Sequence, residues 1–122
     1  KNIFLCKNIM SNDLLSHNSG LYHRDVQKQK TLKVIIYLND VDKYNGPVKI
    51  VEEDHKGIKW FKENIKNNNV PRTTNKELIK NNIKSKIITG ESLTAIFFEG
   101  SLIHSGGYIQ KGIRYSLYLE FF

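Results

Sequence analysis

Apolar and polar residues alternate over several short stretches of the chain, and this period of two predicts β-strands. The stretch TLKVIIYL at 31–38 is rich in β-branched and aromatic residues, so it predicts a mostly buried strand. The stretch VKIVEE at 48–53 predicts a second strand, and the Asn-Gly-Pro turn before it favours a hairpin between the two with a long loop. Further strands are predicted at 94–99 and 111–122, with the loop GGYIQKG before the last of them.

The middle of the chain changes to helical spacing, and about residues 58–86 are predicted to form a short helical insert. Two short helices are expected there with Pro71 between them, and Thr74 or Asn75 is the predicted N-cap of the second. The apolar positions that define the two helices are Ile58, Phe61, Ile65, Leu78, Ile79 and Ile83. The insert is interpreted as a solvated excursion packed on a sheet, with a lid over a site as the alternative. Strands, a helical insert and more strands favour one mainly β domain, an antiparallel sandwich or barrel.

Length and composition predict a single folded domain over residues 1–122. No apolar run approaches eighteen residues, so neither a membrane-spanning helix nor a signal peptide is expected. The single cysteine, Cys6, is consistent with a reducing compartment, and we expect an intracellular, cytoplasmic protein. The formal net charge is +7, but lysines are scattered and arginine is scarce, so we expect no nucleic-acid partner.

A candidate metal site begins in the stretch LYHRDVQ, where His23 and Asp25 stand two residues apart. On a strand their side chains would project from the same face with Cα atoms about 7 Å apart, although a solvated polar face would explain the pair equally well. His104 adds a third candidate ligand at the end of an apolar strand. Two imidazoles and one carboxylate leave open positions on a metal, which is typical of non-haem Fe(II) oxygenases.

A candidate anion site follows ten residues later at Arg114. If the chain turns back antiparallel, Arg114 would lie near His104 on the neighbouring strand, with Ser116 and Tyr118 on the same face. A buried guanidinium needs a counter-anion, and its fork, helped by a serine hydroxyl, suits the far carboxylate of 2-oxoglutarate. A charge on a strand surface is the alternative interpretation of Arg114.

These motifs stand in one order, from about Leu21 to Phe122, and together they resemble the phytanoyl-CoA dioxygenase family of Fe(II)- and 2-oxoglutarate-dependent oxygenases. The residues that carry the resemblance are His23-x-Asp25, Leu38-x-Asp40, Asn45-Gly46-Pro47, His55, His104 and Arg114-x-Ser116.

The resemblance implies a double-stranded β-helix, a cupin-like jelly roll, with Fe(II) held by His23, Asp25 and His104. It also implies that Arg114 and Ser116 hold 2-oxoglutarate as cosubstrate. Oxidative decarboxylation of 2-oxoglutarate to succinate and CO2 would then be coupled to hydroxylation of a small organic substrate by molecular oxygen.

Several neighbouring residues receive weaker assignments. His55 is interpreted as a structural, hydrogen-bonding histidine and His17 as solvent-facing. A second basic contact to 2-oxoglutarate would fall to one of the lysines after Asp25; the candidates are Lys28, Lys30 and Lys33. Cavity-lining candidates, with core packing or turn capping as the stronger interpretation, are Tyr22, Tyr37 and Asn39.

One departure from an active oxygenase is also expected from the sequence. Family members carry N-terminal elements that support the roll, and the short stretch before His23 predicts that this chain lacks them. The alternative function is therefore a catalytically weak or inactive metal-binding or interaction module. The carboxylate at Asp25 argues against the halogenase variant of this chemistry. Neither a nucleic acid nor a membrane is expected as partner, whereas the aromatic end YLEFF suggests packing either against another subunit of a homo-oligomer or against an N-terminal element of the family.

Overall fold

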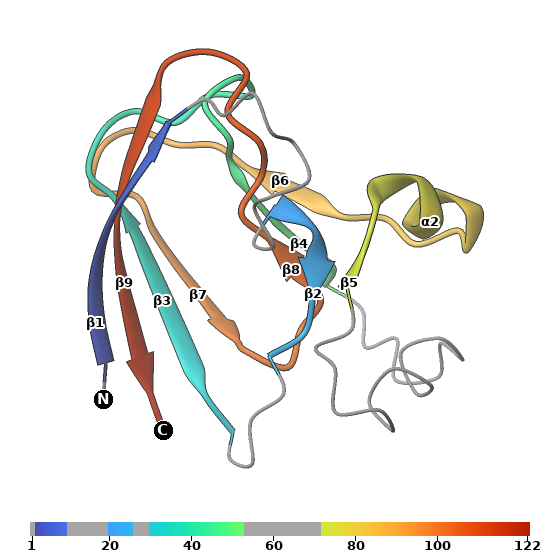
Figure 1. The fold of residues 1–122 in the computed structure, drawn as a ribbon. Coiled ribbons are helices and arrows are strands. Elements are labelled where there is room, and N and C mark those ends of the chain that lie inside the picture. The colour runs from blue at the N-terminus through green and yellow to red at the C-terminus, as the bar shows by residue number, and fades with distance from the viewer. Residues whose placement is uncertain (1, 10–19, 26–29, 53–71) are drawn as a thin grey trace.

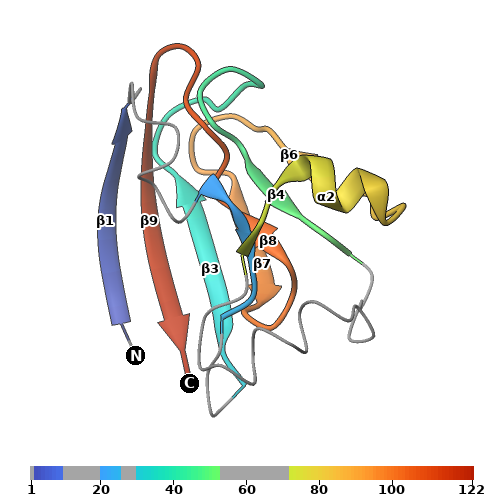
Figure 2. The same ribbon diagram turned by 45° about the vertical axis from the view of Figure 1, so that its right-hand side comes forward.

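A computed structural model describes residues 2–9, 20–25, 30–52 and 72–122 of the chain. These residues form two antiparallel sheets and one short helix (Figures 1 and 2). Sheet A has the order β1-β9-β3-β7, with β1 at Asn2–Ile9, β9 at Ile113–Phe121, β3 at Leu32–Tyr37 and β7 at Ala95–Glu99. Sheet B has the order β5-β2-β8-β4-β6, with β5 at Arg72–Thr73, β2 at Tyr22–His23, β8 at His104–Ser105, β4 at Val48–Ile50 and β6 at Lys86–Ile88. The predicted mainly β fold is therefore confirmed.

The main hydrophobic core lies between the two sheets. β3 contributes Ile35 and Tyr37, β7 contributes Ile96 and Phe98, and β4 contributes residues that include Ile50. Along β7 the buried side chains alternate with exposed ones, as the sequence predicts. The hydroxyl of Tyr37 ties the layers together, because it donates to the carbonyl of Ile88 at 2.8 Å and accepts from the backbone N–H of Val48 at 2.9 Å.

The predicted hairpin between the strands at 31–38 and 48–53 is wrong. β3 pairs with β7 and β9 in sheet A, whereas β4 pairs with β6 and β8 in sheet B. The long loop between them therefore crosses from one sheet to the other. Gly46 makes this crossing tight: its φ is +76°, and a Cβ there would lie 2.7 Å from Cδ1 of Ile109.

The helical insert is shorter than predicted over the part of the chain that the structure describes. α2 spans only Asn75–Lys80, and the side chain of the predicted N-cap Thr74 accepts from the N–H of Glu77. The predicted apolar face is only partly correct, because Leu78 and Ile83 are buried but Ile79 is 67 % exposed. On either side of α2 the described part of the predicted insert forms strand and not helix, in β5 and at the start of β6. The first predicted helix, with Pro71, lies outside the described residues.

The strand β1 was not predicted, because its sequence NIFLCKNI lacks a clear alternation. It pairs along its whole length with β9, from Asn2 opposite Glu120 to Ile9 opposite Ile113. The segment before β2 thus contributes an edge strand to sheet A. No helix among the described residues is long and apolar enough to cross a bilayer.

Candidate functional site

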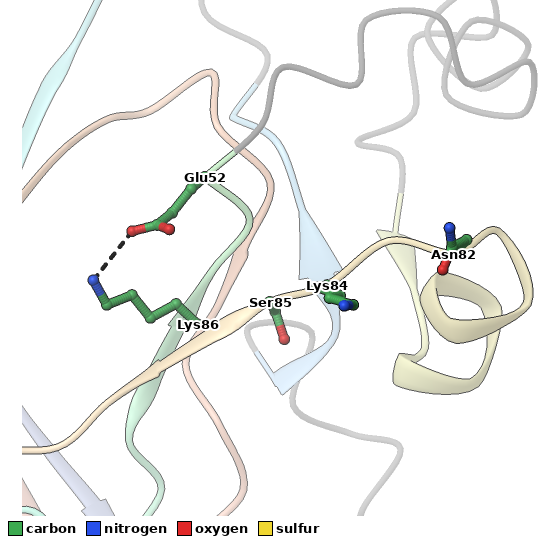
Figure 3. Close-up of a pocket in the computed structure, with 5 residues that line it drawn as sticks. All are labelled: Glu52, Asn82, Lys84, Ser85 and Lys86. Atoms are coloured by element: carbon green, nitrogen blue, oxygen red, sulfur yellow. Dashed lines mark hydrogen bonds and ion pairs between the residues drawn. The ribbon is translucent and has the colours of Figure 1, made fainter.

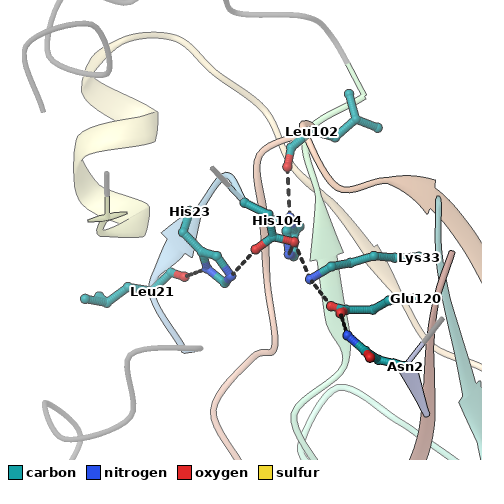
Figure 4. A network of polar contacts seen from close by, with 8 residues as sticks. Asn2, Leu21, His23, Lys33, Leu102, His104 and Glu120 are labelled. Atoms are coloured by element: carbon teal, nitrogen blue, oxygen red, sulfur yellow. Dashed lines mark hydrogen bonds and ion pairs between the residues drawn. The ribbon is translucent and has the colours of Figure 1, made fainter. Parts of the chain in front are cut away.

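The three predicted metal ligands lie close together. Figure 4 shows two of them, His23 and His104, on neighbouring segments of sheet B. His23 in β2 and His104 in β8 are direct partners across the pairing of these two strands. Asp25 lies two residues beyond the end of β2, where its backbone N–H donates to the carbonyl of Gly100 at 3.1 Å. Asp25 is thus positioned by the turn after β7 as well as by its spacing from His23.

The ligand atoms of the three residues lie within 4.8 Å of one another. The Nε2 atom of His23 is 3.8 Å from Oδ1 of Asp25, and the Nε2 atom of His104 is 3.9 Å from Oδ2. Adjacent ligands on an octahedral metal with bonds of about 2.1 Å would be about 3 Å apart. A small inward movement of the carboxylate would therefore bring all three donors to one metal ion.

Both imidazoles are oriented by the same backbone contact. The Nδ1 atom of His23 is 2.8 Å from the carbonyl of Leu21, and the Nδ1 atom of His104 is 2.8 Å from the carbonyl of Leu102. A carbonyl only accepts, so each Nδ1 carries the proton and each Nε2 presents its lone pair. Metal-binding histidines are commonly held in this way by a second hydrogen bond.

Burial keeps both histidines neutral. The pKa of His104 is lowered to about 4, mainly by desolvation. The nearby His23 also lowers this pKa, by more than Asp25 raises it. Desolvation also lowers the pKa of His23, opposed by its bond to the Leu21 carbonyl and by Asp25. Neutral imidazole is the form that binds a metal, so the two rings need not lose protons at neutral pH to act as ligands.

Close packing surrounds the cluster. The rings of His23 and His104 lie 4.4 Å apart between centroids, and Phe98 covers His104 at 4.9 Å. A Cβ at Gly100 would lie 3.2 Å from Oδ2 of Asp25, tighter than an ordinary van der Waals contact. Glycine at this turn therefore leaves room for the carboxylate.

Lys33 also reaches the cluster from β3 of the facing sheet. Its ammonium forms an ion pair with Oδ2 of Asp25 and lies 3.5 Å from Oε1 of Glu120 (Figure 4). The sequence analysis includes Lys33 only as one of three candidate cosubstrate contacts. The period of two along β3, which puts Lys33 on the same face as Ile35 and Tyr37, is a signal that would have distinguished it from the other two lysines but was not used.

Arg114 and Ser116 lie in β9 and are 2 % and 0 % exposed. The prediction that Arg114 and His104 lie on neighbouring strands is wrong, because β9 belongs to sheet A and β8 to sheet B. Period two fixes the face of a side chain but not the sheet in which its strand pairs. Arg114 still approaches the loop after His104, where its Nη1 donates to the carbonyl of Gly106 at 2.6 Å.

The guanidinium of Arg114 is a buried cation with no carboxylate partner among the described residues. Its Nε and the Oγ of Ser116 are both buried without a hydrogen-bond partner in this part of the chain. Burial raises the pKa values of Tyr37 and Tyr118, whose phenols lie close enough to feel the charge of Arg114. Neutral phenols cannot compensate this charge. Across the strand pair, Asn8 of β1 also has a buried Oδ1 without a partner, which no sequence pattern indicated.

Two cavities among the described residues are not lined by the three candidate metal ligands themselves. One, of about 560 Å³, has the polar lining of Glu52, Asn82, Lys84, Ser85 and Lys86 (Figure 3). Its one ion pair, between Lys86 and Glu52 at 3.2 Å, is formed by exposed side chains. The other is an apolar groove of about 430 Å³, which includes Phe98 and Leu102 among its walls.

The remaining sequence-predicted residues have other positions. Tyr22 is 2 % exposed and its hydroxyl lies 2.7 Å from Oγ of Ser85, so it packs in the core beside α2. Asn39 joins the segment after β3 to β9, because its Oδ1 accepts from the N–H of Tyr115 at 2.7 Å. Lys30 is exposed. His17, Lys28 and His55 lie outside the described residues.

Comparison of the sequence with models of known protein families finds no match, and comparison with curated proteins finds none either.

Proposed function

We propose that this protein is an Fe(II)- and 2-oxoglutarate-dependent dioxygenase that hydroxylates a small organic substrate and releases succinate and CO2. The observation that carries the proposal is the pairing of two different sites in one small domain. A cluster of two neutral imidazoles and a carboxylate is accompanied by a buried arginine without a carboxylate partner among the described residues.

The donor set fits the proposed metal. His23, Asp25 and His104 would hold Fe(II) through two imidazole nitrogens and one carboxylate oxygen, which leaves positions for a chelating cosubstrate and dioxygen. The backbone carbonyls of Leu21 and Leu102 would hold the rings in the metal-binding tautomer.

The anion site fits 2-oxoglutarate. A buried guanidinium without an anion is costly, and the unpaired Nε of Arg114 and the unpaired hydroxyl of Ser116 would both donate to one carboxylate. The two residues lie two positions apart in β9, so their side chains share one face of the strand.

When bound, Fe(II) and 2-oxoglutarate would supply the oxidising chemistry, which protein side chains lack. The chain itself would bind and orient these groups. Phe98, packed against His104, would exclude water from one side of the metal, and Arg114 with Ser116 would hold the cosubstrate at its far end. Such positioning is the protein's share of the rate acceleration.

We also propose that the two sheets belong to a double-stranded β-helix. In support, four connections that run entirely through described residues cross between sheets: from β3 to β4, from β6 to β7, from β7 to β8 and from β8 to β9. Such crossings are expected when two sheets face each other as in a jelly roll.

The experiment is an anaerobic titration of the protein with Fe(II) and 2-oxoglutarate, followed by addition of oxygen and a succinate assay. The expected result is a metal-to-ligand charge-transfer band that is absent in His104→Ala, and succinate formation after oxygen. No band in the wild type, or the same band in His104→Ala, would contradict the proposal. Iron binding without 2-oxoglutarate binding would instead support the inactive metal-binding module.

A further inference from the structure

Lys33 forms an ion pair with Asp25, the carboxylate that the proposed metal would bind. Its side chain is 14 % exposed and lies between Asp25 and Glu120, which are 18 % and 20 % exposed. The oxygen of Asp25 that pairs with Lys33 is Oδ2, the same oxygen that faces Nε2 of His104. The ammonium of Lys33 and a divalent metal ion would therefore compete for the carboxylate of Asp25.

The geometry of Asp25 is consistent with this competition. Its oxygens are 3.8 and 3.9 Å from the two histidine nitrogens, whereas adjacent ligands of an octahedral ion are about 3 Å apart. Asp25 must move toward the imidazoles to bind a metal. Lys33 pairs with this carboxylate from sheet A, so the ion pair opposes that movement.

Glu120 offers the ammonium a second position. Lys33 and Glu120 are direct partners across β3 and β9, and Nζ of Lys33 is already 3.5 Å from Oε1. The other oxygen of Glu120 accepts from the side-chain amide of Asn2 at 3.4 Å, which helps to orient the carboxylate. A change of side-chain rotamer is sufficient to move the ammonium from one carboxylate to the other.

We propose that Lys33 is an internal counter-cation that pairs with Asp25 in the metal-free protein and transfers to Glu120 when a metal binds. The inference rests on the proposed metal site and concerns its regulation. In the metal-free protein Lys33 compensates a largely buried carboxylate. In the metal-bound protein repulsion between Lys33 and the metal favours the pair with Glu120. Lys33 should therefore weaken metal binding, and Glu120 should strengthen it.

The experiment measures binding of Co(II) to the full chain by calorimetry, without 2-oxoglutarate and without turnover. Lys33→Met is expected to bind Co(II) about tenfold more tightly than the wild type, and Glu120→Gln about threefold to tenfold more weakly. In the double variant the effect of Glu120→Gln should vanish, because no ammonium remains to be transferred. The exposed pair Lys86 and Glu52 is the matched control, and Lys86→Met and Glu52→Gln should leave the affinity unchanged.

The sign of the effect decides the proposal. If Lys33 only orients Asp25 from behind, Lys33→Met weakens Co(II) binding, and this result, like an unchanged affinity, would overturn the transfer. Circular dichroism and thermal unfolding check that each variant is folded, and Glu120→Gln tests the same transfer if Lys33→Met unfolds. If neither the wild type nor any variant binds Co(II), both the metal site and the transfer of Lys33 are contradicted. If Lys33→Met binds Co(II) and the wild type does not, the result supports competition by Lys33 and contradicts an active site in the wild type.

Discussion

His23 and His104 face each other across the pairing of β2 and β8, and each ring donates from Nδ1 to the carbonyl two residues before it. The same local contact is thus repeated on two strands that are 81 positions apart (104 − 23 = 81). It directs both Nε2 atoms toward Asp25. A solvated polar strand face does not need either ring to be held in this way, whereas histidines that bind a metal commonly donate their second N–H to an acceptor.

Substitution of a ligand should abolish metal binding without unfolding the protein. His104→Ala removes one of three donors, so we expect Co(II) affinity to fall at least about a hundredfold, since even the loss of a supporting residue costs about ten- to a hundredfold. Calorimetric titration measures the change. His17→Ala, at a histidine that the sequence predicts to face solvent, is the control and should bind as the wild type does.

Substitution in the anion site should separate cosubstrate binding from metal binding. Arg114→Lys keeps the charge but loses the planar fork, so we expect affinity for 2-oxoglutarate to fall about tenfold or more while Co(II) affinity is unchanged. Ser116→Ala should cause a smaller loss, about twofold to tenfold, because it removes one neutral donor. Equal losses of metal and 2-oxoglutarate binding would indicate general disruption of the fold instead.

The stability of the metal-free protein should depend on pH through His104. Its pKa is lowered to about 4 from the ordinary 6.5, so between these values the unfolded chain binds a proton that the folded chain does not. The free energy of unfolding should therefore be highest above about pH 6.5 and fall as pH decreases toward 4, by on the order of 3 kcal/mol. Urea unfolding of the wild type and of His104→Gln at several pH values measures the contribution of His104, because only the wild type should lose this part of its stability as pH falls. If the free energy of unfolding depends on pH in the same way in both proteins, the prediction is wrong.

Gly100 should be required for the shape of the metal site. Gly100→Ala places a Cβ about 3.2 Å from Oδ2 of Asp25, so the carboxylate must shift. We expect Co(II) affinity to decrease about tenfold, as for loss of other supporting contacts. Ser101→Ala is the control in the same turn, because Ser101 is exposed and its hydroxyl donates to Glu99 at 2.9 Å, and this variant should bind Co(II) normally.

Tyr37 should stabilise the packing of the two sheets through its hydroxyl. Tyr37→Phe leaves the N–H of Val48 and the carbonyl of Ile88 without this partner in a buried position, so we expect a loss of about 1–3 kcal/mol in the free energy of unfolding. Denaturant unfolding measures the loss. Tyr44 is 44 % exposed, and Tyr44→Phe should change stability by less than about 0.5 kcal/mol.

The sequence predicted individual strands better than their partners. The alternation at 94–99 correctly placed Ile96 and Phe98 on one face of a strand, because the two faces follow from local geometry, and the structure shows that this face is the buried one. Pairing was predicted from chain order and was wrong twice, for β3 with β4 and for β8 with β9. Chain order favours neighbouring strands, but strands that cross between facing sheets bury more apolar surface against each other than a hairpin in one layer.

The sequence by itself determined the residue types of the candidate site: two histidines, an aspartate, an arginine and a serine in a fixed order. Only the tertiary structure decided that His23 and His104 are strand partners and that Asp25 reaches them from a turn held by Gly100. It also decided that Lys33 and Glu120 lie beside the same carboxylate. The physical reason is that local spacing sets the direction of a side chain, whereas its distance from a residue on another strand depends on how the sheets pair and pack.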